Sequence, residues 1–310
     1  DFEGKRATGV TFLHNGQRLQ ALAHRELILA AGSIGSTQLL QVSGIGPANV
    51  LAGAHIPVVH DLPGVGENLQ DHLQLRMIFK LQGAKTLNTL ANSLVGKARM
   101  GLEYALRRTG PLSMAPSQLG AFAFSDPSQE RPNIEFHVQP LSLDKFGDPL
   151  HRFPAMTAAP CNLRPTSRGH VRITSPDIAV PPQILCNYLQ TPEDRQVAAA
   201  GLLLTRRIMA QPAMARYQPE EYLPGTAAST EQELEQAAAQ IGTTIFHPVG
   251  TCKMGVDDMA VVDPRLRVHG LQNLRVIDAS IMPTITSGNT NSPTIMIAEK
   301  GARMVLEDAG

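Results

Sequence analysis

The sequence predicts a mixed α/β and α+β fold, in which one α/β lobe is built from both ends of the chain and an antiparallel-sheet lobe is inserted between them. Near the start, a strand runs into a glycine and a helix, and near the end a short strand leads towards an apolar helix. Short alternating strands and helices occupy the middle. We expect the lobe boundaries at 1–71, 72–242 and 243–310.

Composition limits the classes of partner. The chain has 310 residues and 43% hydrophobic content, which is enough for a sizeable core. Lys plus Arg and Asp plus Glu both count 27, so the formal net charge is zero and no polyanion such as a nucleic acid is expected as a partner. Because no run of eighteen apolar residues occurs, no transmembrane segment is expected.

The cysteines indicate a reducing environment. Cys161, Cys186 and Cys252 are odd in number and widely spaced, with no Cys-x-x-Cys pair. Neither a disulfide framework nor a zinc site is favoured by this arrangement, so we expect no metal. The cytoplasm is the expected location.

The N-terminal lobe opens with a hairpin signal. Asn15-Gly16 separates a strand at Val10–Leu13 from a second strand at Leu19–Leu29, and Asn-Gly is the strongest short hairpin turn. The second strand is apolar on both faces near its end. It is therefore expected to be central in a parallel or mixed sheet.

A strand that runs directly into a glycine and a helix start is typical of a ligand-facing turn. Here the glycine is Gly32, and Ser33 or Ser36 is the expected helix cap. This helix should end near 44–47, and a short helix from Pro47 should end at Gly53.

The middle of the chain predicts an antiparallel sheet with helices. Thr191 and Thr230 are expected N-caps, each with an acidic residue three positions on. The expected elements are a helix over 87–109, strands at 133–138 and 170–174, and helices over 192–209 and 231–241.

His247 is the first candidate for chemistry. It follows the strand-like pair Ile245-Phe246 and precedes Pro248, which prevents a helix and favours an extended turn. A histidine at a strand end can accept a proton from a hydroxyl near neutral pH. A half-buried structural histidine is the alternative, and the chain has ten histidines.

Asp278 is the second candidate. It closes the strand 274–277, and an acid at the carboxyl end of a strand can bind the hydroxyl groups of a dinucleotide. A helix or turn cap is the alternative interpretation.

The third candidate is a helix N-terminus. Ser292-Pro293 indicates a cap with proline at the first helical position, and the helix that follows is mostly apolar, so we expect it to be buried. A buried helix N-terminus presents unpaired N–H groups that stabilise an anion. Asn289, just before it, would add a second polar group to a substrate oxygen. An ordinary capped core helix is the alternative.

Several motifs resemble those of the glucose-methanol-choline (GMC) oxidoreductases, in the order of that family. The resemblance covers nearly the whole chain, and the middle resembles the variable substrate lobe. The matching segments are Leu29–Leu40, Ser43–Pro47, Leu62–His72, His247–Gly255, Val261–Pro264 and Val276–Lys300.

The resemblance implies roles for individual residues. His247 matches the active-site histidine beside the flavin, and Asn289 matches a second active-site position that is His or Asn among members. It also implies that the cofactor is FAD and that the helix after Pro293 stabilises the reduced flavin. The residues that match FAD-contacting positions are Ala31, Gly32, Asp278, Ala279, Thr290 and Asn291.

The resemblance implies oxidation of a primary alcohol to the aldehyde, with hydride transfer to flavin N5. The asparagine at position 289 resembles the residue found at this place in the choline and aliphatic alcohol dehydrogenase branches. Choline-like, aliphatic and aromatic alcohols all remain candidate substrates. The electron acceptor is open between oxygen and another partner, and through that partner the protein could associate with a membrane.

One departure from the family concerns the phosphates of FAD. The family begins with a strand, Gly-x-Gly-x-x-Gly and a helix, and this chain has no such motif. Gly44-Ile45-Gly46-Pro47 does not replace it, because proline follows the second glycine. The FAD-binding lobe is therefore expected to be incomplete. The alternative function is a catalytically incomplete fragment or subunit, with the N-terminal FAD-binding segment supplied elsewhere.

Overall fold

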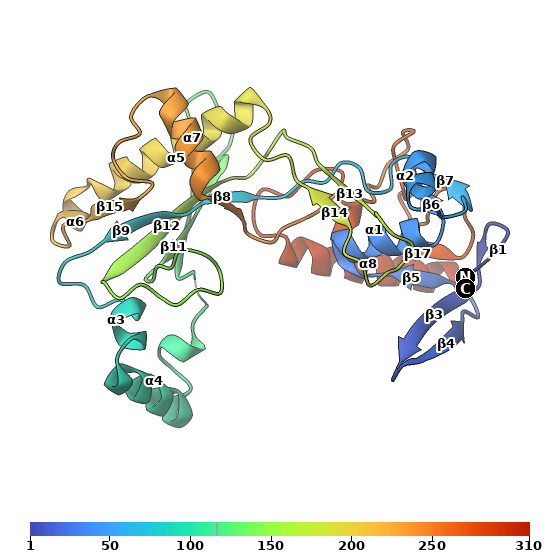
Figure 1. The fold of residues 1–310 in the computed structure, drawn as a ribbon, viewed down its shortest axis with the longest axis horizontal. Helices are drawn as coiled ribbons and strands as arrows, with labels where there is room; N and C mark the ends of the chain where they lie inside the picture. Colours follow the sequence, from blue (N-terminus) through green and yellow to red (C-terminus); the bar gives the residue numbers. More distant parts are fainter. Residues whose placement is uncertain (116) are drawn as a thin grey trace. The chain divides into compact units, whose positions relative to one another are not determined.

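The computed structural model describes residues 1–115 and 117–310 and contains two compact units. Unit 1 comprises residues 1–71, 167–188 and 246–310, and unit 2 comprises residues 72–166 and 189–245. The mixed fold class predicted from the sequence is confirmed (Figure 1). Among the described residues, no helix combines the length and the apolar character needed to cross a membrane.

Unit 1 consists of small sheets and three helices around a core of aliphatic side chains. Its strands are β1 (Phe2–Glu3), β2 (Arg6–Ala7), β3 (Gly9–His14), β4 (Gln17–Leu22), β5 (Leu27–Leu29), β6 (Ile45–Gly46), β7 (His60–Asp61), β13 (His170–Arg172), β14 (Gln183–Leu185) and β17 (Leu274–Val276). Its helices are α1 (Gly32–Val42), α2 (Ala48–Gly53) and α8 (Asn291–Asp308), and it also contains the 3₁₀ turn η2 (Ala279–Ile281).

The predicted hairpin is confirmed, but its second strand is shorter than expected. β3 pairs with β4 in antiparallel register, and Asn15 and Gly16 both have positive φ, as a type I′ turn requires. The chain leaves the hairpin after Leu22 and forms β5 as a separate strand. The expected continuous strand over 19–29 is therefore wrong.

β5 forms a parallel pair with β17, which joins the two ends of the chain. The prediction of parallel pairing is thus confirmed. The expected central burial is not, because Ile28 in β5 is 43% exposed and the sheet has only these two strands. Among the described residues of unit 1, no third strand joins the sheet formed by β5 and β17.

Unit 2 contains a seven-stranded antiparallel sheet, as the sequence predicts. Its strands are β8 (Leu73–Leu75), β9 (Met77–Lys80), β10 (Leu119–Ala123), β11 (Ile134–Gln139), β12 (Ala155–Asn162), β15 (Glu220–Leu223) and β16 (Gly242–Thr244). Its helices are α3 (Leu87–Ala91), α4 (Leu94–Arg107), η1 (Pro111–Ser113), α5 (Pro192–Met209), α6 (Pro212–Ala215) and α7 (Glu231–Ile241).

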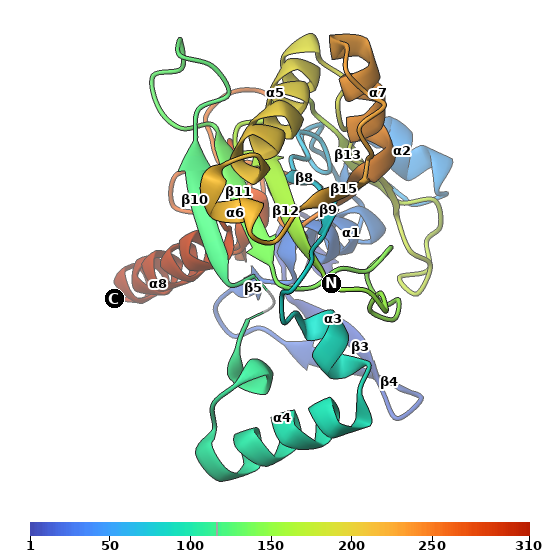
Figure 2. The same ribbon diagram turned by 90° about the vertical axis from the view of Figure 1, so that its left-hand side faces the viewer.

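Helices α5 and α7 lie side by side and cover one face of the sheet (Figure 2). Their apolar side chains pack on Leu75, Met77 and Phe79, which alternate along β8 and β9 towards this face. Both predicted caps are confirmed: Thr191 accepts from the Asp194 N–H, and Thr230 forms a capping box with Glu233. The single helix expected over 87–109 is two helices, because the chain turns at Asn92.

Residues 167–188 fall in unit 1, although the sequence predicts them in the middle lobe of 72–242. The reason is tertiary: the Val171 N–H donates to Gly66 O at 2.7 Å, and the Leu69 N–H donates to Gly169 O at 3.0 Å. The Gln41 side chain also donates to Val171 O at 3.0 Å. No local pattern in the sequence announces these contacts. The assignment of FAD-binding and substrate-binding roles to the units stays a prediction.

Candidate active site

Three motifs that are far apart in the sequence meet at the start of α1, all within unit 1. Ser33 Oγ donates to Pro248 O at 2.6 Å, which ties α1 to the loop that carries His247. Thr251 Oγ1 donates to Ser33 O at 2.7 Å. The same loop is joined to η2, because the Cys252 N–H donates to Ser280 O at 2.9 Å. The predicted site residues in these motifs therefore belong to one structural cluster.

Asp278 holds this cluster together as a buried cap. One carboxylate oxygen accepts from the Gly32 N–H at 3.0 Å and from Ser36 Oγ at 2.6 Å, and the other accepts from the Ser280 N–H at 2.8 Å. A negative charge at the N-terminus of α1 also favours the helix dipole. The structure thus realises the capping interpretation of Asp278. Neither Ser33 nor Ser36 is the N-cap, which corrects the sequence expectation: Ala31 is the N-cap residue, without a side-chain bond.

His247 and Asn289 face each other. Nε2 of His247 lies 3.5 Å from Nδ2 of Asn289, at the outer limit of a hydrogen bond. Asn289 is exposed and His247 is half-buried. Two polar groups this close can both reach one oxygen atom of a small molecule. A histidine and an amide arranged in this way can accept a proton and orient a hydroxyl.

Helix α8 begins immediately after Asn289 and Thr290, but not as the sequence predicts. Its N-cap residue is Thr290, so Pro293 is the third helical residue and Ser292 is not the cap. Thr294 Oγ1 donates back to Thr290 O at 2.7 Å and fastens this first turn. The proline is still compatible with the helix, because its missing N–H belongs to the unpaired first turn.

The expected burial of α8 is also wrong. Ile297 and Gly301 are buried, but Ile295 and Met296 are 58% and 59% exposed. The helix therefore packs along one stripe only, and its N-terminal residues Asn291 and Ser292 are exposed. The apolar composition of a helix does not determine its burial, because burial depends on which faces have neighbours.

The sequence alone indicates no role for Asp71 and Tyr188. Asp71 Oδ1 accepts the backbone N–H of His247 at 2.9 Å, and Tyr188 donates its hydroxyl to Asp71 Oδ2. Asp71 stands in a motif noted for its family resemblance, where an acid just before a strand is the only local signal. Tyr188 carries no local signal at all.

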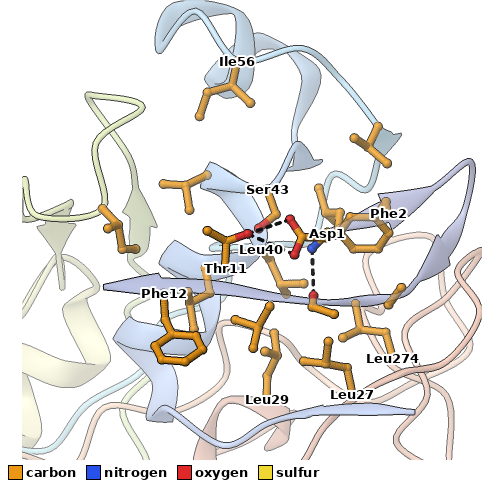
Figure 3. Close-up of a pocket in the computed structure, with 18 of the residues that line it drawn as sticks. Asp1, Phe2, Thr11, Phe12, Leu27, Leu29, Leu40, Ser43, Ile56 and Leu274 are labelled. Atoms are coloured by element: carbon orange, nitrogen blue, oxygen red, sulfur yellow. Dashed lines mark hydrogen bonds between the residues drawn. The ribbon is translucent and has the colours of Figure 1, made fainter. Parts of the chain in front are cut away.

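One pocket of about 800 Å³ lies elsewhere in unit 1, between the β3–β4 hairpin, β5 and α1 (Figure 3). Its lining is mainly apolar and includes Phe12, Leu29 and Leu40. Asp1 is part of the lining, and its ammonium donates to Gly9 O at 2.8 Å. None of the predicted site residues lines this pocket. It is therefore separate from the His247 cluster and offers few groups for catalysis.

Comparison with family models identifies the family of the chain. Two segments match models described as GMC oxidoreductase, residues 2–74 and residues 165–298. Oxygen-dependent choline dehydrogenase of Paraburkholderia xenovorans (strain LB400) is 44% identical over 299 residues, which is 96% of this chain and 53% of the relative. The enzyme of the same name from Pseudomonas fluorescens (strain Pf0-1) is 44% identical over 303 residues, with the same coverage. The chain belongs to the GMC oxidoreductase family.

Solved structures agree with this membership. Pyridoxine 4-oxidase from Mesorbium loti superposes with a TM-score of 0.83 at 31% identity, over 97% of this chain and 55% of that one. The R554A variant of formate oxidase from Aspergillus oryzae RIB40, in a study of FAD modification, gives a TM-score of 0.90 at 25% identity over 97% and 57%. The chain thus spans about half the length of the relatives that it matches.

Proposed function

We propose that this chain contains the catalytic residues of an FAD-dependent alcohol oxidoreductase, which oxidises a primary alcohol to the aldehyde. The observation that carries the proposal is the approach of His247 Nε2 to Asn289 Nδ2, at 3.5 Å, beside the start of α8. It brings together two residues that are 42 positions apart in the chain. Family membership supports the same reaction class.

His247 and Asn289 have different roles towards the substrate hydroxyl. His247, or a base that it positions, accepts the hydroxyl proton, and Asn289 holds the oxygen through its amide. Which ring nitrogen of His247 carries the proton in the resting state depends on its tautomer. Because neutral imidazole has one unprotonated nitrogen, the group must be neutral before it can act as a base.

Bound FAD would supply the hydride acceptor for this oxidation. We assign the flavin contacts to Ala31, Gly32, Ala279, Thr290 and Asn291, and Asp278 holds Gly32 in place beside them. Two features support this fit. Gly32 and Gly288 have positive φ, and a Cβ at either position would meet no atom within 4 Å, so flat groups can approach the backbone there. The first turn of α8, where Asn291 and Ser292 are exposed, would favour negative charge on a group bound against it.

The phosphates of FAD would be held by residues outside this set, because the sequence has no Gly-x-Gly-x-x-Gly motif. This leads to the second candidate function. The chain is a catalytically incomplete fragment or subunit that needs a separate segment to bind the FAD phosphates. Flavin absorbance of the purified chain separates the two. About one flavin per chain would exclude the fragment interpretation, and a colourless chain that turns yellow only with the missing segment would support it.

The tyrosines of this chain do not by themselves support choline as the substrate. An aromatic cage for a quaternary ammonium needs free ring faces. Cations of this chain lie over three of its four tyrosines: Lys80 over Tyr222 at 4.9 Å, Arg108 over Tyr104 at 5.2 Å and Arg216 over Tyr217 at 4.6 Å. The fourth, Tyr188, is bound to Asp71. The tyrosines of this chain are therefore engaged, and the name shared by the choline dehydrogenase relatives does not decide the substrate.

The test is His247→Ala in the protein completed with the FAD-binding segment. Turnover should fall by a factor on the order of 10²–10⁴, because a positioned base is lost, while flavin content stays the same. Unchanged turnover would reject the assignment. Dye reduction with choline, aliphatic and aromatic alcohols, run with and without oxygen, identifies both the substrate and the electron acceptor. We expect a cytoplasmic location, with membrane contact only if the acceptor is membrane-bound.

A further inference from the structure

The backbone of His247 is anchored by a carboxylate from a distant part of unit 1. The His247 N–H donates to Asp71 Oδ1 at 2.9 Å, across 176 positions of sequence. Asp71 is 5% exposed, so this hydrogen bond to a charged group is shielded from water. Hydrogen bonds of this type are about twice as strong as neutral ones.

The chain around His247 needs such an anchor. Phe246 has a φ of 64°, in the left-handed region that is unfavourable for a residue other than glycine. On the other side, Pro248 restricts His247 to extended conformations, and the Pro248 carbonyl accepts from Ser33 Oγ at 2.6 Å. Strained backbone persists only where its surroundings hold it. Asp71 holds one end of this short segment, and Ser33 holds the other.

Tyr188 completes the anchor. Its hydroxyl donates to Asp71 Oδ2, so the two oxygens of Asp71 have different partners. Burial, together with the charge of Asp71, raises the pKa of Tyr188 well above its usual range. The hydroxyl therefore remains a donor at any physiological pH. Tyr188 lies in the segment 167–188 that joins unit 1 by tertiary contacts.

We propose that Asp71, oriented by Tyr188, is a positioning residue that directs the His247 ring towards Asn289 and the substrate hydroxyl. The proposal rests on the proposed function, because His247 must be the group that acts on the substrate. Asp71 touches the backbone of His247 and not the reacting atoms. Its loss should thus change the geometry of the base rather than remove the base.

The first measurement uses the chain itself and needs no activity. In Asp71→Ala, the His247 amide proton should exchange with solvent about tenfold faster or more, because its charged acceptor is gone. Asp71→Asn keeps an oxygen that accepts this N–H and should retain most of the protection. Tyr188→Phe should show an intermediate loss. Asp263→Ala is the matched control: Asp263 accepts the N–H groups of Arg265 and Arg267 in the same unit, and its loss should leave the His247 amide unchanged.

The second measurement is kinetic, in the completed holoenzyme. Asp71→Ala should lower kcat by about 10–100-fold with KM within about twofold and flavin content unchanged, because small displacements of a catalytic group cost rates of that order. Asp71→Asn should recover most of kcat, and Tyr188→Phe should add nothing in the Asp71→Ala background.

The outcomes separate the two proposals. If His247→Ala abolishes turnover but Asp71→Ala leaves kcat and the His247 amide unchanged, positioning by Asp71 is overturned and the proposed function stands. If Asp71→Asn loses as much kcat as Asp71→Ala while the His247 amide stays protected, positioning is also overturned. If His247→Ala itself keeps full turnover, the proposed function fails. Should Asp71→Ala not fold, Asp71→Asn and Tyr188→Phe still decide the question.

Discussion

Unit 1 and unit 2 differ in how completely their buried charged side chains are paired. In unit 1, the buried side chains of Asp278 and Arg275 each have several partners. Asp278 accepts three hydrogen bonds. Arg275 is 3% exposed and pairs with Glu26 and Asp308, both at 2.6 Å. Such groups are expensive to bury, and complete pairing compensates for that cost while fixing the geometry.

Unit 2 buries charges on one sheet face without such partners. Arg76 is 5% exposed, and none of its three guanidinium nitrogens has a hydrogen-bond partner among the described residues. Its guanidinium lies 4.6 Å from the centre of the Phe146 ring, and burial lowers the pKa of Arg76. The pair Glu135 and His137, 3.6 Å apart, also lacks hydrogen bonds at the facing atoms.

The register of the sheet places these residues on the same face. Glu135 pairs with Cys161, which pairs with Gln74, and alternation puts His137 and Arg76 on that face too. The opposite face carries the apolar contacts with α5 and α7. Unit 2 can satisfy buried charge elsewhere, since Asp194 accepts from Asn162 and from the Thr166 N–H. The difference therefore belongs to this one face. Complete pairing offsets the cost of buried charge in unit 1, whereas the unpaired charge should destabilise this part of unit 2.

The largest effect is expected from Asp278→Ala in unit 1. The change leaves the Gly32 and Ser280 N–H groups and the Ser36 hydroxyl without their acceptor in a buried site. The free energy of unfolding should fall by about 3 kcal/mol. Urea unfolding of the purified chain measures it. Asp257→Ala, the same chemical change at an exposed carboxylate of unit 1, is the control and should have little effect.

The sequence predicts those parts of the molecule whose determinants are local. Helices α5 and α7 carry their own caps, and Asn15-Gly16 defines the hairpin, so all three could be placed in advance. His247 and Asn289 could be proposed as a pair only through the family resemblance. Their approach to 3.5 Å is a tertiary fact.

The parts that could not be predicted depend on distant partners. The cap of α1 comes from Asp278, 246 positions after Gly32, so the nearby Ser33 and Ser36 were misleading. Likewise, Tyr188 meets Asp71 across 117 positions. The exposure of α8 depends on which of its faces find neighbours, and an apolar sequence does not contain that information.

Arg76→Met tests the comparison in unit 2 and should have the opposite sign. Methionine has a similar shape without the charge, so the free energy of unfolding should rise by about 1–3 kcal/mol. The matched control is Arg206→Met in the same unit, since Arg206 forms two hydrogen bonds with Glu221, at 2.8 and 2.9 Å. That change should destabilise by about 2 kcal/mol, because the Arg206 side chain is partly exposed. If both substitutions destabilise equally, Arg76 is as well satisfied as Arg206 and the contrast between the units is wrong.

The smallest effect is a pH dependence confined to unit 1. Burial raises the pKa of the Cys252 thiol to about 12 from an ordinary 9.0. Because the folded state keeps the proton while the unfolded state loses it, the stabilisation is complete below pH 9.0 and is lost as pH rises towards about 12. At about pH 10 the loss should be on the order of 1 kcal/mol. Hydrogen exchange of α1 amides, corrected for intrinsic base catalysis, should show it, and α7 amides in unit 2 should not. Cys252→Ala should remove this part of the pH dependence. If the exchange of α1 amides in this variant still rises with pH, another group is responsible. Tyr188 is then the next candidate, because its pKa is also raised in the folded state.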